Sequence, residues 1–225
     1  MAFRDFVYPA VIDRLGLTAH TADLSAGASP VPMRPEFAAL FDECLAIAVA
    51  DLGVCTEKAR SEFLIAPVLV ELRRAMDRRF SVFSGMELNV NRGRGLNGAC
   101  DYILTKGDNQ HLREAPIIGI LEAKNEDYCN QGLGQCVAAM FAAQLRNKSA
   151  GWAVARVFGA CTTGRAWQFL SLEGTALTTD WTPYRTNDLG RVLGILKHRV
   201  ERTLEANGNK PTAGAVSEPA LTAPS

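Results

Sequence analysis

Hydrophobic residues recur at helical spacing in four long stretches of the chain, and this pattern predicts four helices. The stretches are residues 35–53, 56–79, 128–148 and 188–204, and a short amphipathic helix is expected within residues 1–17. Thr56 is a candidate N-cap for the second of them. Pro67 lies inside the same stretch and predicts a kink or a restart there.

Strand character dominates between these helices. The expected strands are residues 80–90, 99–105, 116–124, 152–163 and 166–172. Residues 116–124 are a nearly continuous apolar run, which is typical of a central strand covered on both faces. Trp167 and Phe169 are expected in the core. The order of elements predicts an α/β fold with a mixed central sheet flanked by helices.

Composition restricts the classes of protein that fit. The 225 residues carry a formal net charge of zero, so any nucleic-acid contact has to come from local clustering of basic residues. No apolar run reaches the roughly 18 residues that span a bilayer. The six cysteines form no Cys-x-x-Cys pair, and the three histidines lie far apart. We expect a cytoplasmic protein with buried, reduced cysteines, no zinc site and no membrane association.

Three charged residues stand at the ends of two apolar strands. Alternation along the second strand places Ile118, Ile120, Glu122 and Lys124 on one face. Asp101 lies near the start of the preceding strand. If the two strands are antiparallel neighbours, the start of one lies beside the end of the other. All three charged side chains then meet at one edge.

Two converging carboxylates form an oxygen site for a hard cation such as Mg²⁺ or Mn²⁺. Asp101 and Glu122 would supply the carboxylates, and the backbone carbonyl of Ala123 is a third protein oxygen. Lys124 would then orient or deprotonate an attacking water, or stabilise charge on a phosphate. Taken alone, Glu122 and Lys124 favour a surface ion pair, and Asp101 could equally be a turn residue. The three residues together are more informative than any one of them.

The constellation resembles the PD-(D/E)xK nuclease superfamily. Its signature is an acid on one strand and Glu/Asp-x-Lys on the next, followed by a helix, and Asp101, Glu122 and Lys124 match these positions. The proline that precedes the acid is absent, since Ala99 and Cys100 stand there. The resemblance implies a restriction-endonuclease-like core that hydrolyses phosphodiester bonds with Mg²⁺ or Mn²⁺.

Two further segments resemble the nuclease domain of type I restriction-enzyme motor subunits. "SEFLIAPVLVELRR" is similar to the helix before the core, and "TTGRAWQFLSL" to a later hairpin. The resemblance implies that Glu62 lies near the metal, and we expect its side chain on the inward face with Ile65, Leu69, Leu72 and Met76. It predicts a nuclease domain over residues 56–206, after an N-terminal helical extension and linker (1–55) and before a disordered tail (207–225).

Other polar residues are candidates for contacts with the substrate. Related nucleases place a glutamine on the helix after the lysine, near the scissile phosphate. Gln135 is the first choice and Gln131 the second, while an exposed helix amide is the alternative for either. Arg92 and Arg94, in a glycine-rich turn, are the preferred nucleic-acid-binding residues. Four other arginines could line a phosphate-tracking groove, with solvated helix ends as the alternative: Arg73, Arg74, Arg78 and Arg79.

The leading functional hypothesis is a metal-dependent endonuclease that acts on nucleic acid, with DNA favoured. The rival is a catalytically silent module that keeps the fold and binds nucleic acid or a partner protein. A third reading makes the charged strand ends purely structural. The sequence contains no Walker motif, so we expect no motor within it. A protein partner that supplies specificity and a homodimer are both left open.

Overall fold

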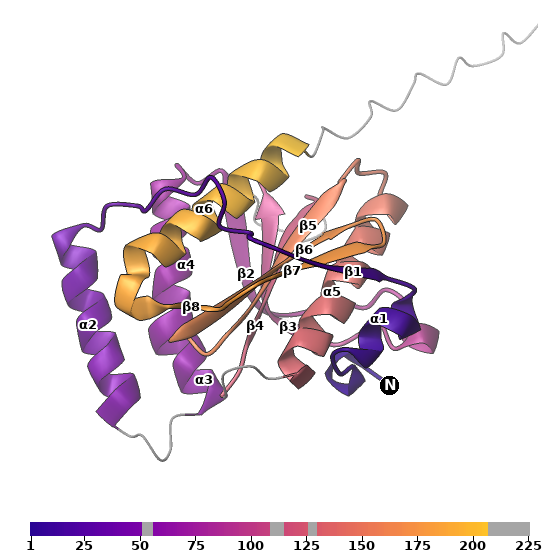
Figure 1. The fold of residues 1–225 in the computed structure, drawn as a ribbon, viewed down its shortest axis with the longest axis horizontal. Coiled ribbons are helices and arrows are strands. Elements are labelled where there is room, and N and C mark those ends of the chain that lie inside the picture. Colours follow the sequence, from indigo (N-terminus) through magenta and orange to yellow (C-terminus); the bar gives the residue numbers. More distant parts are fainter. Residues whose placement is uncertain (51–55, 109–114, 126–129, 207–225) are drawn as a thin grey trace, which may run out of the picture.

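The computed structural model describes residues 1–50, 56–108, 115–125 and 130–206. It is an α/β structure with an eight-stranded mixed sheet flanked by helices, as predicted (Figure 1). The strands are β1 (Thr18–Ala22), β2 (Phe80–Glu87), β3 (Ala99–Lys106), β4 (Ile117–Ala123), β5 (Arg156–Thr162), β6 (Ala166–Glu173), β7 (Ala176–Asp180) and β8 (Tyr184–Arg185). The principal helices are α1 (Ala10–Leu15), α2 (Pro35–Ala50), α3 (Glu57–Arg60), α4 (Ala66–Ala75), α5 (Asn130–Ser149) and α6 (Leu189–Ala206).

The sheet combines parallel and antiparallel pairs. Its order is β1-β7-β6-β5-β4-β3-β2, and β8 pairs with β6. The β4–β5 and β1–β7 pairs are parallel, while β2–β3, β3–β4, β5–β6 and β6–β7 are antiparallel. Strand β4 therefore lies inside the sheet, and all seven of its residues are buried. This burial confirms the prediction made from its apolar run.

Two hydrophobic cores lie on opposite faces of the sheet. One joins α2, α4 and α6 to one face, and its largest members include Trp167 and Phe169, as expected. The other joins α1, α5 and the N-terminal Phe3 and Phe6 to the opposite face. The boundary predicted at residue 56 stays a prediction, although these N-terminal residues pack into the same core as α5. The predicted disordered tail, 207–225, lies outside the described residues.

Three strands were missed from the sequence: β1, β7 and the two-residue β8. β1 is exposed along nearly its whole length and joins the edge of the sheet through backbone pairing with β7. It therefore lacks the apolar alternation that identifies a half-buried strand. β7 is short and rich in threonine. Residues 1–17 form a 3₁₀ turn, Phe3–Asp5, and α1 instead of one helix.

The predicted face of Ile118 is wrong. Ile118 packs in the core with Leu121 and Ala123, whereas Ile120 packs in the core on the other face. The pairing of β3 with β4 shifts register between Leu104 and Thr105. Such an irregularity interrupts the strict two-residue alternation on which the prediction depended.

The predicted second helix begins at its expected cap and changes geometry in the middle. The Thr56 hydroxyl accepts a hydrogen bond from the Ala59 amide at 3.1 Å. A π-helical turn, Ser61–Ile65, then separates α3 from α4, and Pro67 lies in the first turn of α4. A proline at this position needs no intrahelical donor, so the helix restarts there as predicted.

No helix among the described residues is long and apolar enough to cross a membrane.

Helix α4 is fixed to the segment before α2 by a buried carboxylate. Glu71 is only 2 % exposed, and Arg34 and Arg74 donate to its two oxygens at 2.8 and 2.7 Å. Hydrogen bonds from Arg74 and then Arg34 outweigh the effect of burial and lower the pKa of Glu71 from 4.5 to about 2. This clamp, formed by Glu71 with Arg34 and Arg74, holds helix α4 in place.

We predict that Glu71→Gln lowers the free energy of unfolding by about 2 kcal/mol at pH 7, because both arginines are half exposed and solvent reduces the full linkage value. A lowered carboxyl pKa stabilises the fold above pH 4.5, and that contribution is lost as the pH falls toward 2. Urea unfolding from pH 2 to 7 tests this, with exposed Glu36→Gln as the control. If the difference in unfolding free energy between wild type and Glu71→Gln is as large at pH 2 as at pH 7, the stabilising role of the Glu71 ion pairs is contradicted.

Candidate active site

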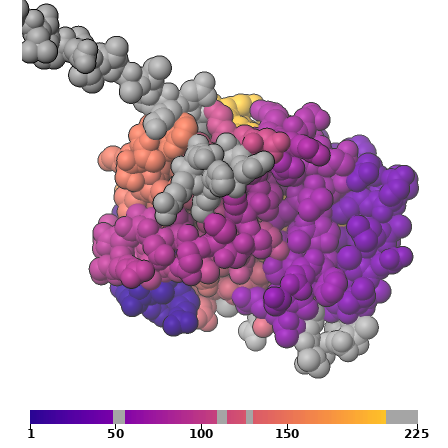
Figure 2. Space-filling model, turned by 180° about the vertical axis from the view of Figure 1, so that it is seen from behind, coloured from indigo at the N-terminus to yellow at the C-terminus, as the bar shows by residue number. Residues whose placement is uncertain are grey.

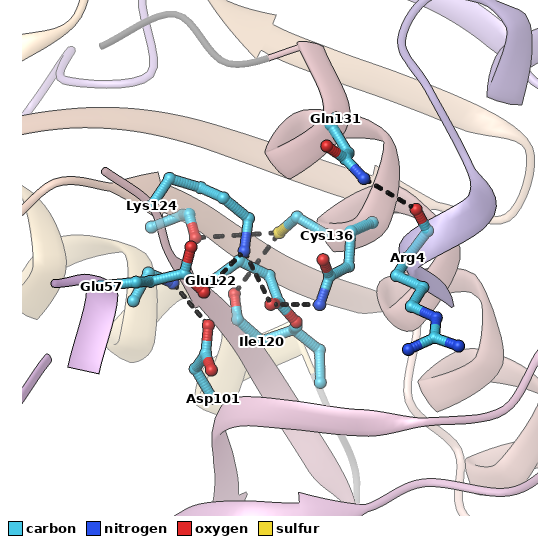
Figure 3. A network of polar contacts seen from close by, with 11 residues as sticks. Arg4, Glu57, Asp101, Ile120, Glu122, Lys124, Gln131 and Cys136 are labelled. Carbon is cyan, nitrogen blue, oxygen red and sulfur yellow. Dashed lines mark hydrogen bonds and ion pairs between the residues drawn. The ribbon is translucent and has the colours of Figure 1, made fainter. Parts of the chain in front are cut away.

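The antiparallel pairing of β3 and β4 brings Asp101 beside the end of β4. Tyr102 pairs with Leu121 across the two strands, so Asp101 lies next to Glu122. The Asp101 carboxylate Oδ2 accepts a hydrogen bond from the backbone amide of Ala123 at 2.7 Å. The two predicted carboxylates therefore meet at one edge, as expected from the sequence (Figure 3).

Glu122 is a fully buried carboxylate. The amide of Gln135, on α5, donates to its Oε2 at 2.7 Å, whereas Oε1 is buried with no hydrogen-bond partner in the described structure. Burial and then the neighbouring carboxylate of Asp101 raise the pKa of Glu122 well above its ordinary value. The reading of Glu122 as part of a surface ion pair is therefore wrong. Gln135, the first-choice glutamine, is directly in contact with the site.

Lys124 is held between two carboxylates. Its Nζ lies 3.3 Å from Glu57 Oε1 and 4.0 Å from Glu122 Oε2 (Figure 3). Burial by itself would lower the pKa of Lys124, but the negative charges of Glu122, Glu57 and Asp101 outweigh burial and raise it. Lys124 is consequently an ammonium ion at neutral pH. It can donate hydrogen bonds and stabilise negative charge, but it is poorly suited to remove a proton.

A glycine on α5 makes room for the lysine. A Cβ at Gly132 would lie 2.6 Å from Cγ of Lys124 and 2.8 Å from the Cys161 sulfur. Any larger side chain would push the lysine stem away from its present path. Gly132 is a site residue that the sequence reasoning missed, and the glycine inside the otherwise helical 128–148 stretch was the available signal.

The acid that the first helix contributes differs from the predicted one. Glu62 is 56 % exposed and pairs with Lys58 at 3.5 Å, so the expected inward orientation is wrong. The π-helical turn rotates Glu62 away from the buried stripe of Ile65, Leu69, Leu72 and Met76. Glu57, in the first turn after the Thr56 cap, makes the contact with Lys124 instead.

The other predicted contact residues lie away from the carboxylates. The Gln131 side chain donates to the backbone carbonyl of Arg4 at 3.1 Å and ties the N-terminal segment to α5. The Arg94 guanidinium lies 5.4 Å above the ring of Phe141 on α5. Arg92 shares a short 3₁₀ turn with Arg94. The sequence placed these arginines close to Asp101, but the fold directs their turn toward α5.

A groove of about 980 Å³ opens beside the site. Asp101 and Glu57 lie at its lining, with α3 and α4 on one side and β2 on the other. Arg73, Arg74 and Arg78 also line the groove, whereas Arg92, Arg94 and Arg79 are not among the described residues that line it. Of the arginines considered from the sequence, those that line the groove thus lie at or just beyond the end of α4.

The donor set fits a hard divalent cation. Glu122 Oε1 is an unpartnered buried oxygen next to a second carboxylate, and such an oxygen is stabilised by a cation. The carbonyl of Ala123 points to the same edge as its amide, which bonds Asp101, so it can supply the predicted third oxygen. Within the described ranges no cluster of three or more His, Cys, Asp and Glu side chains is arranged to hold a metal. A cation here would depend on two carboxylates and the backbone.

Comparisons with known proteins give no family for this chain. No protein-family model matches the sequence, and no curated protein matches it. The resemblance to PD-(D/E)xK nucleases therefore depends on the motif residues and their geometry.

We predict that Glu122→Gln raises the stability of the metal-free protein. A carboxyl with a raised pKa destabilises the fold as the pH rises above 4.5, because the native state must give up a proton that it holds tightly. The substitution removes that penalty. In urea unfolding with EDTA, Glu122→Gln should have a higher midpoint than wild type at pH 8. The difference between the two midpoints should be smaller at pH 4.

The same variant tests the metal site. Mn²⁺ should raise the melting temperature of the wild-type protein and of the exposed control Glu43→Gln, but not that of Glu122→Gln. An equal Mn²⁺ response in all three proteins would show that the cation binds elsewhere.

Proposed function

We propose that this protein is a metal-dependent nuclease of the PD-(D/E)xK type, with a restriction-endonuclease-like core, that hydrolyses phosphodiester bonds of nucleic acid. The observation that carries the proposal is the meeting of Asp101, Glu122 and Lys124, with one buried oxygen of Glu122 left without a partner. A purely structural role would leave this buried oxygen without a partner, which is costly inside a protein.

Asp101 and Glu122 would hold Mg²⁺ or Mn²⁺, with the carbonyl of Ala123 as a third ligand. When bound, the cation would supply Lewis-acid stabilisation of the charge that develops on the phosphate. Gln135 fixes the orientation of Glu122 through its hydrogen bond to Oε2. That bond leaves Oε1 free to face the cation.

Lys124 would act as a fixed cation beside the reacting phosphate. Its raised pKa keeps it protonated, so its role is to position the attacking water and to stabilise negative charge. Glu57 holds the Lys124 ammonium group from the opposite side to Glu122. Glu57 is therefore a positioning residue in this proposal.

DNA is the first candidate substrate, and a separate protein that supplies specificity fits the same proposal. A cytoplasmic location also belongs to it, since four cysteines among the described residues carry thiols outside disulfides, which suits a reducing compartment. The alternative is a silent binding module. It would bind nucleic acid or a partner without cleavage, and the next experiment separates the two.

We predict that purified protein with Mg²⁺ or Mn²⁺ cleaves at least one member of a panel of supercoiled plasmid, linear duplex, single-stranded DNA and RNA. Lys124→Ala should lower the rate at least ~100-fold, because a preorganised cation at the reacting phosphate is lost. EDTA should abolish cleavage. Lys148→Ala, an exposed lysine of α5, is the matched control and should cleave normally.

Two outcomes would count against the proposal. Normal cleavage by Lys124→Ala would remove the lysine from the mechanism. Folded protein that binds nucleic acid in EDTA but cleaves nothing on the panel would favour the silent module.

We also predict that Glu57→Gln and Glu62→Gln behave differently. Loss of the Glu57 charge should lower cleavage about 10-fold or more, since it orients Lys124. It should also lower the pKa of Lys124, so the alkaline limb of the pH–rate profile should move to lower pH. Glu62→Gln, exposed and paired with Lys58, should stay within about 2-fold of wild type. Equal losses in both variants, without a shift of the profile, would contradict the assignment to Glu57.

A further inference from the structure

The groove beside the site has two chemically different ends. Three acids, Glu57, Glu62 and Asp101, line it near the candidate metal site together with one lysine, Lys58, which pairs with Glu62. Four arginines line its other end: Arg34, Arg73, Arg74 and Arg78. Figure 2 views the molecule from behind, where the purple residues of α3 and α4 lie beside the magenta residues of β2 and β3. Acidic and basic groups are therefore separated along one surface channel.

The helical wall sets the distance between these ends. Arg73 follows Glu62 by 11 residues along the π turn and α4. At about 1.5 Å per residue this places the arginine end roughly 16 Å from the acidic end. In a helical nucleic-acid strand, phosphates are spaced about 3.4 Å apart along the axis, so this distance corresponds to roughly five nucleotides.

The arginine end keeps positive charge that the fold does not neutralise. Glu71 is the only carboxylate among the described lining residues at this end, and Arg34 and Arg74 share it. Both guanidinium groups remain nearly half exposed, at 45 % and 46 %. Arg73 pairs with Asp108. Arg78 is exposed and has no ion pair within the described residues.

The middle of the groove favours contact with a backbone over contact with bases. Ala66, Leu69 and Val70 line one side, and Ser81 and Ser84 line the other. Tyr102 is the only aromatic residue among the described lining, and it is 3 % exposed with its hydroxyl bonded to Ser61. It offers no open ring face on which a base could stack.

We propose that the groove binds the sugar–phosphate backbone of one nucleic-acid strand, on one side of the bond to be cut. The arginine end holds phosphates several nucleotides from the scissile bond and does so without reading the sequence. This inference rests on the proposed function and adds to it a minimum substrate length and a set of binding residues. Substrates too short to reach the arginines are held only at the acidic end.

The test measures binding apart from cleavage. Labelled oligonucleotides of 2 to 12 nucleotides are titrated with protein in EDTA by fluorescence anisotropy, at several salt concentrations. Single-stranded and duplex forms of the longest oligonucleotide distinguish a free strand from one strand of a duplex. The variants are Arg78→Gln, Arg74→Gln and their combination. Arg79→Gln, an exposed neighbour outside the groove lining, is the matched control.

The wild-type affinity should rise with length and level off once the strand spans the groove. Arg78→Gln should weaken binding of the 12-mer about 3- to 10-fold and lower the salt slope by about 0.7 for a single strand. The double variant should lose more, and Arg79→Gln should match wild type. If Arg79→Gln weakens binding as much as Arg78→Gln, or if neither variant changes it, the groove assignment is overturned.

A small diester separates failure of the groove from failure of the active site. Hydrolysis of bis(p-nitrophenyl) phosphate with Mn²⁺ by wild type, but not by Lys124→Ala, supports the catalytic site without using the arginine end. If this hydrolysis is seen but the Arg74 and Arg78 variants bind oligonucleotides as tightly as wild type, only the groove assignment is overturned. If binding depends on the arginines but neither bis(p-nitrophenyl) phosphate nor nucleic acid is hydrolysed, the proposed nuclease activity is overturned. The assignment of the groove as a binding site is then still supported.

Discussion

The burial of Glu122 beside a second carboxylate, that of the partly exposed Asp101, is the constraint on which the rest of the site depends. Antiparallel pairing of β3 with β4 fixes Asp101 against the amide of Ala123 and places Glu122 beside it, inside the protein. Burial removes the hydration of Glu122, and the neighbouring charge of Asp101 repels it, so the pKa of Glu122 rises. The surrounding polar groups can be understood as responses to that charge.

The responses come from three parts of the chain: α5, the residue after β4, and α3. Gln135 on α5 satisfies one oxygen of Glu122, and Lys124 brings a positive charge to within 4.0 Å of it. Glu57 on α3 then holds the lysine, and Gly132 leaves space for its stem. Compensation is incomplete because one oxygen of Glu122 has no partner in the described structure. A hard cation would complete it, which connects the electrostatics of the fold to the proposed chemistry.

The wall formed by α3, the π turn and α4 links this site to a more distant binding surface. Its first turn supplies Glu57, and its last turn supplies Arg73 and Arg74 at the far end of the groove. The clamp of Arg34 and Arg74 on Glu71 holds this wall in place and uses residues that also line the groove. Fold stability and substrate binding would therefore respond together to substitutions at this end.

The sequence by itself determined the α/β class, the helices and the central strands, because hydrophobic periodicity and strand alternation are local properties. It indicated Asp101 and Glu122 as strand-end acids, but the antiparallel pairing of β3 with β4 is what brings them together. Only the tertiary structure decided that Glu57, not Glu62, reaches the lysine, since a π turn changes the helical phase without a visible signal. It also decided that the arginines of α4, not Arg92 and Arg94, line the groove. Distance along the chain does not determine on which side of a sheet a turn packs. Edge strands such as β1 are held by backbone pairing, which the side-chain pattern of the sequence does not reveal.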